Sequence, residues 1–297
     1  MRKILLIIGV VSAASFLAGA YGSSLGHAGP HAGAAPARLA AAHSPSPAFL
    51  AKARSALVAY LNHSRQTALT FPAGAARNGS SKQSYNWAGY VDIGARGTFT
   101  HAAGSWAVPA VTTCGAEDQI MSNWIGLDGW NDNSVEQAGT TSWCYEGTAT
   151  YFTWYEMYPG PAIEVGKSVH PGDQIRTSIA RSGANYTLVV TDSTHPAASF
   201  THKATCALTK CLDTSAEWIV ERPAFAIGVA PLADYGTWAL TGGVETAHGK
   251  AGTIGSYTAS GSPIKLTMGD ATQAYTLTSV TSLTGGSAFT TTWHNSY

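Results

Sequence analysis

The sequence predicts an all-β fold, a single antiparallel β-sandwich, for residues 85–297. Threonine, valine, tyrosine and tryptophan abound in this region, and glycines interrupt it at short intervals. Short alternating runs indicate strands at 186–191, 264–268, 275–278 and 289–293. Turn signals such as Pro171-Gly-Asp173 and Gly285-Gly286 separate them, and no helical period persists there. About 210 residues of short strands suffice for one sandwich with a full core.

The first 20 residues have the pattern of a secretory signal peptide. Arg2 and Lys3 are followed by an apolar stretch from Ile4, and Ala18-Gly-Ala20 resembles a cleavage site. No later segment is long and apolar enough to span a bilayer. We therefore expect a secreted, extracellular protein that is not held in a membrane once the signal is removed.

Residues 21–84 are expected to be a basic prosegment. Residues 21–47 are rich in Gly, Ala, Pro and Ser and predict disorder. A helix is predicted over 48–62, because Ser46 can cap it, Pro47 suits its first turn, and apolar residues recur at helical spacing at Leu50, Ala53, Leu57 and Leu61. Residues 71–84 are predicted to be a loop, and the mature domain is expected to begin near 85.

The charge distribution suggests what the prosegment does. Residues 1–91 contain eight Lys or Arg and no acidic residue, whereas all seventeen acidic residues lie between Asp92 and Asp270. Opposite charges on leader and body attract one another, so we expect the leader to be an intramolecular inhibitor. A tether or an aid to folding or export is the alternative. The acidic body is a poor partner for nucleic acid, and we expect a monomer.

Four cysteines, Cys114, Cys144, Cys206 and Cys211, fit an oxidising compartment. Three pairings are possible. The short 206–211 loop favours a local bridge, which leaves Cys114–Cys144 as the second. The cysteine and histidine spacings do not match a zinc site, and we expect no metal and no cofactor.

The segment Ser215-Ala-Glu-Trp-Ile-Val-Glu221 is the most informative part of the chain. It has the composition of a strand but carries Glu217 and Glu221, a residue type that strands disfavour. Side chains alternate along a strand, so both carboxylates point to one face. That face is either solvated or lines a cleft in which a carboxylate is used.

Three other segments combine large aromatic residues with polar groups: 86–90, 124–140 and 154–159. On a strand, Trp154, Glu156 and Tyr158 share one face and surround a carboxylate with aromatic rings. Such a mixture is typical of a binding cleft. A lectin groove or the rim of a core would also account for it.

Together these segments resemble the glutamic peptidases, the eqolisin family (peptidase family G1). The resemblance rests on five motifs in the family's order: Asn86-Trp-Ala-Gly, Trp124-Ile-Gly-Leu-Asp-Gly, Gln137-Ala-Gly-Thr, Trp154-Tyr-Glu-Met-Tyr-Pro and Ala216-Glu-Trp-Ile-Val-Glu. It implies a concanavalin A-like jelly roll of two curved antiparallel sheets. It also implies a catalytic pair, Gln137 and Glu221, on the concave face. Glu217 is not assigned to that pair.

The resemblance further implies that the cleft contains Trp124, Asp128, Trp154, Glu156 and Tyr158. Phe152 departs from the family, whose fungal members commonly carry an Asp there. The segment after Asp128 also differs from the fungal pattern, which affects the expected disulfides and subsite preferences.

The expected activity is that of an acid endopeptidase acting on polypeptides. A carboxylate such as Glu221 can take a proton from water and later protonate the leaving amine. The amide of Gln137 can donate to the oxyanion. The alternatives are a jelly-roll glycoside hydrolase that uses Glu156 and Glu221, and a carbohydrate-binding module without catalysis.

Overall fold

A computed structural model describes residues 46–61, 64–65, 81–115, 117–130, 132–225, 228–257, 259 and 261–297. The expected signal peptide, the segment 21–45 and most of the predicted 71–84 loop lie outside these ranges. No helix in the described part of the chain is long and apolar enough to cross a membrane.

The described chain is almost entirely β-structure, as predicted. The one α-helix in it is α1 (Pro47–Leu61). A short 3-10 helix, η2 (Pro196–Ala198), lies between β10 and β11. All four predicted strands are present, as β10, β17, β18 and β19. The strands are β1 (Ser64–Arg65), β2 (Ser81–Ser84), β3 (Trp87–Ile93), β4 (Phe99–Ala107), β5 (Gln119–Leu127), β6 (Val135–Tyr145), β7 (Thr148–Tyr158), β8 (Ile163–Ser168), β9 (Gln174–Ser182), β10 (Asn185–Asp192), β11 (Phe200–Thr205), β12 (Ser215–Glu221), β13 (Ala224–Phe225), β14 (Gly228–Val229), β15 (Thr237–Ala247), β16 (Lys250–Thr253), β17 (Ile264–Gly269), β18 (Thr276–Val280) and β19 (Phe289–Trp293).

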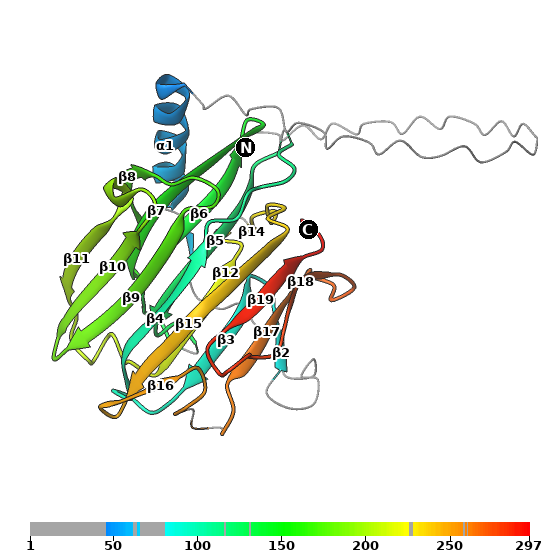
Figure 1. Cartoon of the computed structure of the whole chain (residues 1–297). Helices are drawn as coiled ribbons and strands as arrows, with labels where there is room; N and C mark the ends of the chain where they lie inside the picture. The colour runs from blue at the N-terminus through cyan, green and yellow to red at the C-terminus, as the bar shows by residue number, and fades with distance from the viewer. Residues whose placement is uncertain are drawn as a thin grey trace, which may run out of the picture. The chain divides into compact units, whose positions relative to one another are not determined.

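Apart from β1, β13 and β14, which form a small sheet of their own, the strands form one continuous hydrogen-bonded path. Its order is β11-β10-β9-β4-β15-β19-β18-β17-β3-β12-β5-β6-β7-β8, with β16 beside β15 and β2 beside β17 (Figure 1). The pairing is antiparallel except between β2 and β17. The path turns back on itself, so that β4, β9 and β10 also lie against β5, β6 and β12 without pairing with them. The all-β, antiparallel prediction is confirmed.

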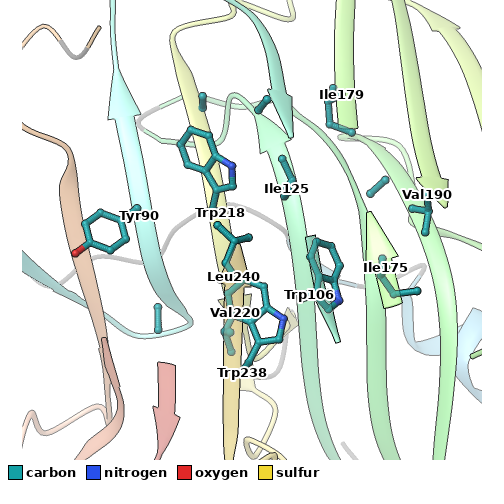
Figure 2. Close-up of a cluster of buried hydrophobic side chains, with 14 of the residues drawn as sticks. Tyr90, Trp106, Ile125, Ile175, Ile179, Val190, Trp218, Val220, Trp238 and Leu240 are labelled. Carbon is teal, nitrogen blue, oxygen red and sulfur yellow. The ribbon is translucent and has the colours of Figure 1, made fainter. Parts of the chain in front are cut away.

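A large apolar core fills the space between the layer that contains β4, β9 and β10 and the layer that contains β5, β6 and β12. Trp218 and Val220 of β12 contribute to it, together with Trp106, Trp238 and Leu240 from other strands (Figure 2). The Trp218 indole nitrogen donates to the carbonyl of Ala103 at 2.9 Å. This bond satisfies a polar group that would otherwise be buried without a partner.

A second apolar cluster lies on the opposite side of the same central strands. We call it the tryptophan face. Its buried members are Trp87, Val91, Ile120, Trp124, Trp130, Val135, Trp143, Phe152, Trp154, Ala162, Ile219, Ala230, Ile264 and Leu266. Strand alternation explains the division, because Trp218 and Val220 point into the core while Ile219 points to the tryptophan face.

Three described elements precede residue 85. The predicted helix is confirmed as α1, and the Ser46 hydroxyl accepts from the backbone N–H of Phe49 at 3.2 Å. Strand β1 pairs with β13, immediately after the Glu221 strand. Residues 81–84, predicted to be the end of a loop, instead form β2 along β17. The β-structure therefore begins a few residues before the predicted boundary.

Both predicted disulfides are present. Cys114 is joined to Cys144 and Cys206 to Cys211. The first bridge ties the segment before β5 to the end of β6, the two strands that carry Trp124 and Gln137. The second closes a short loop ahead of β12.

Gly139 lets β5 and β6 approach closely beneath the tryptophan face. A side-chain carbon at this position would lie 1.9 Å from the carbonyl oxygen of Asn123 and 2.8 Å from the α-carbon of Trp124. Both atoms belong to backbone, which cannot move without disturbing the pairing of the two strands.

We predict that Gly139→Ala lowers the free energy of unfolding by about 3 kcal/mol or more, because the added methyl forces β5 and β6 apart. Urea denaturation measures this change. Gly115→Ala is the matched control, since no atom lies within 4 Å of a carbon added there. Equal stability of the two variants would contradict the assigned close approach.

Candidate active site

Strand β12 places Glu221 in the interior of the sheet. It pairs with β3 on one side and β5 on the other, so its backbone is fixed along both edges. Glu217 and Glu221 lie on the side of Ile219, the tryptophan face, as the alternation predicted. Both glutamates are fully buried, so the solvated-face interpretation does not apply to this form of the chain.

The Glu221 carboxyl is surrounded by nitrogen donors. The indole N–H of Trp124 donates to its Oε2 at 2.8 Å, and the Asn86 side chain donates to Oε1 at 3.3 Å. Burial raises the pKa of Glu221 to about 8, even though these donors and the nearby Trp87 indole act in the opposite direction. The carboxyl is thus held in place, but in this buried form its proton is retained up to mildly alkaline pH.

A local turn orients Asn86. The Ser84 hydroxyl donates to the Asn86 side-chain oxygen at 3.2 Å and accepts from the backbone N–H groups of Asn86 and Trp87. Since the amide oxygen is used by Ser84, the amide nitrogen is directed at Glu221. The Asn86-Trp87 motif thus contacts the carboxyl, a role the sequence alone did not assign.

Gln137 and Glu156 form a second buried pair on the tryptophan face. They lie opposite one another on β6 and β7, and the Gln137 amide donates to Glu156 Oε2 at 2.7 Å. Burial raises the pKa of Glu156 well above its ordinary value, and the charge of Glu221 raises it further. Glu156 is therefore bonded to Gln137 and is affected by the charge of Glu221 on the same face.

The strand register determines the layout of these groups. Glu217, Gly126, Gln137 and Glu156 form one row across β12, β5, β6 and β7, whereas Glu221 aligns with Ser122. The row between them holds Trp124 and Gly139. Gly126 contributes no side chain to this row, and the Trp124 ring lies 2.9 Å from where its β-carbon would stand.

The remaining predicted cleft residues divide into two groups. Trp154 and the half-buried Tyr158 belong to the tryptophan face or pack against it, as expected. Phe152 is also buried there, on the row of Ser122 and Thr141 that ends at Glu221. An apolar ring therefore occupies the position where fungal relatives commonly carry an Asp.

Asp128 lies at the other end of β5 from the Glu221 row. Its carboxylate accepts from the backbone N–H groups of Asp213 and Thr214 at 2.8 and 2.7 Å, and from the Ser134 hydroxyl at 3.3 Å. These bonds anchor the residues that lead into β12. The structure thus gives Asp128 a positioning contact, and a direct part in the cleft stays a prediction.

Comparison with known proteins identifies the family. The sequence profile of the peptidase A4 family matches residues 85–293. The chain belongs to this family. Aspergillopepsin-2 from Aspergillus niger is 27% identical over 238 residues, which cover 72% of this chain and 80% of the relative. This chain is therefore a glutamic peptidase, a peptide hydrolase, as the sequence resemblance implied.

Solved structures share the fold. Scytalido-glutamic peptidase with a transition-state analogue inhibitor superposes with a TM-score of 0.58 at 19% identity, covering 71% of this chain and 98% of that one. SCP-B, an eqolisin-family peptidase in complex with the tripeptide Ala-Ile-His, gives a TM-score of 0.56 at 19% identity, with the same coverage of each chain. The family favours peptide hydrolysis over the glycosidase and carbohydrate-binding alternatives.

The burial of Glu221 generates a prediction about pH and stability. Its pKa is about 8 in the folded chain and near the ordinary 4.5 when unfolded, so between these values only the folded state keeps the proton. The free energy of unfolding should therefore fall as pH rises through this window, by up to about 5 kcal/mol from this group.

Glu221→Gln should remove part of that pH dependence, because the amide does not ionise. Chemical denaturation at pH 4.5, 6 and 8 measures it. Glu117→Gln, at an exposed glutamate, is the control and should leave the dependence unchanged. An unaltered slope in Glu221→Gln would show that the carboxyl is already ionised in the folded chain.

Proposed function

We propose that this chain is a secreted endopeptidase that hydrolyses proteins at acid pH, with Glu221 and Gln137 as its catalytic residues. The observation that carries the proposal is the arrangement around Glu221. An oriented, buried carboxyl shares the tryptophan face with an oriented side-chain amide, in a chain of the peptidase A4 family.

Glu221 would act first as base and then as acid. As a carboxylate it takes a proton from the attacking water, and the same proton then passes to the leaving amine when the C–N bond breaks. Trp124 and Asn86 donate to separate oxygens of the carboxyl. They hold it in one orientation and stabilise the ionised form that starts the cycle.

Gln137 would stabilise the oxyanion. Its amide nitrogen has two hydrogens, and one of them is donated to Glu156. The other is available for a substrate carbonyl oxygen as negative charge develops there. Glu156 is then a positioning residue, which fixes the direction of the amide.

Activity at acid pH requires the Glu221 pKa to lie below its value in the buried form. Burial is the largest cause of the raised pKa. Exposure of the tryptophan face to water would lower it towards the acid range, where a carboxylate base is effective. Uncovering this face is therefore part of the proposed activation.

The leader residues described here fit the role of an intramolecular inhibitor. Ala56 of helix α1 packs against the tryptophan face, and the Phe49 ring lies tilted against Tyr145 with ring centroids 6.0 Å apart. Lys52 forms an ion pair of 2.7 Å with Glu146 at the β6–β7 turn. Strand β1 extends the contact by pairing with β13, three residues beyond Glu221.

Acid would weaken this contact. Protonation of Glu146 in acid would remove the ion pair with Lys52. That pair alone contributes little to the contact, because both side chains are exposed and water screens their charges. Release would need the other carboxylates of the acidic body to be protonated as well.

We predict that Glu221→Gln lowers kcat at least about 10²-fold and that Gln137→Ala lowers it about 10²–10³-fold, because one removes the base and the other the oxyanion donor. Casein hydrolysis at acid pH by the processed enzyme measures both. Glu217→Gln is the matched control: it lies on the same strand and face, and should keep most of the activity. Full activity in folded Glu221→Gln would overturn the catalytic assignment.

If the leader inhibits the enzyme, the unaltered proform should become active only after a lag on transfer to pH 4. We predict that the Ala53→Asp proform becomes active without that lag. Ala53 is buried, so a charged side chain there should expel the helix from the body. Ala51→Asp, on the exposed side of the same helix, should show the lag of the unaltered proform. Identical time courses for the two variants would argue against inhibition by α1.

A further inference from the structure

A second group of potential ligands lies outside the catalytic machinery, where the turn between β8 and β9 meets the loop after β10. His170, Asp173 and His195 each offer one ligand atom there, and these atoms all lie within 4.8 Å of one another. Neither the family resemblance nor the proposed mechanism uses any of the three.

The first two ligands belong to one tight turn. Pro171 and Gly172 occupy its centre, with Gly172 at φ 92°, and the Asp173 N–H donates to the His170 carbonyl at 3.0 Å. This matches a type II turn, which requires a residue of positive φ at its third position. The His170 backbone N–H also donates to Asp173 Oδ2 at 2.7 Å, which fixes the carboxylate.

The third ligand is fixed by a separate turn. Asp192 Oδ1 accepts from the backbone N–H groups of Thr194 and His195, both at 2.8 Å. This places the His195 ring beside the β8–β9 turn. Its Nδ1 lies 2.7 Å from Asp173 Oδ1, while His170 Nδ1 lies 3.4 Å from Asp173 Oδ2. Both Nδ1 atoms therefore face a single carboxylate.

The carboxylate of this group is buried, whereas its two imidazole rings are open to solvent. The side chain of Asp173 is only 2% exposed, whereas those of His170 and His195 are 62% and 53% exposed. A solute can reach the ring nitrogens, and the two rings can rotate to adjust their distances without moving the backbone.

Negative charge collects at the base of this group. Asp192 is buried beside Asp173, and its Oδ2 has no hydrogen-bond partner among the residues described. In the described chain, the ion pairs of Asp173 are with histidines alone.

We propose that His170, Asp173 and His195 form a binding site for a divalent transition metal such as Zn²⁺. Two imidazoles and one carboxylate are ligands of the type that zinc accepts, at bond lengths of about 2.0–2.2 Å, with a fourth position left for water. Nitrogen ligands disfavour Ca²⁺ and Mg²⁺, which prefer oxygen. The bound ion would join the β8–β9 turn to the loop after β10.

Isothermal titration of the full chain with zinc chloride at pH 7.5 tests the site. We expect one saturable ion per chain and, for His170→Ala or His195→Ala, affinity at least about tenfold weaker. His294→Ala, at an exposed histidine of another strand end, is the matched control and should bind as the unaltered chain does.

The leader also contains histidines, at 27, 31, 43 and 63, and the double variant His170→Ala/His195→Ala separates the two sources. Loss of the one-ion isotherm in the double variant supports the proposal. Undiminished binding in the double variant, or no saturable binding in the unaltered chain, overturns it. A Co²⁺ titration followed by visible absorption reports on the same site without relying on activity.

Discussion

The arrangement around Glu221 depends on one hydrogen bond, from the Trp124 indole to the Glu221 carboxyl. A carboxyl fully removed from water is costly unless donors replace the lost solvent. Trp124 and Asn86 supply these donors. Trp124 belongs to β5, which flanks β12 on one side, and Asn86 lies just before β3, which flanks it on the other. The central position of β12, between β3 and β5, is what brings those donors to the carboxyl.

The same strand has to satisfy two different environments. Trp218 and Val220 fill the apolar core between the layers, while Glu217, Ile219 and Glu221 occupy the tryptophan face. A shift of one residue in register would exchange these sets and bury the glutamates in the core. Asp128 opposes such a shift, because its carboxylate holds the backbone N–H groups of Asp213 and Thr214 just ahead of the strand.

Much of this arrangement could be predicted from the sequence, because alternation along strands is a local property. It predicted the common face of Glu217 and Glu221, the positions of β10, β17, β18 and β19, helix α1 and both disulfides. It did not predict β2, because pairing with β17, nearly two hundred residues later, is a long-range effect that the loop-like composition conceals. Nor did it assign Asn86 to Glu221 or separate Asp128 from the Glu221 row, since both depend on the strand register.

We propose that the ionisation of Glu221 governs activity and is controlled by the covering of its face. Carboxyl ¹³C NMR of glutamate-labelled protein, with the Glu221 signal assigned from its absence in Glu221→Gln, measures this pKa directly in the full chain and after acid processing. We expect the Glu221 pKa to be near 8 in the full chain. After processing we expect a lower Glu221 pKa that coincides with an inflection in the pH profile of kcat/KM. An unchanged pKa after processing, or one that coincides with no kinetic inflection, would show that covering of the face does not control this carboxyl.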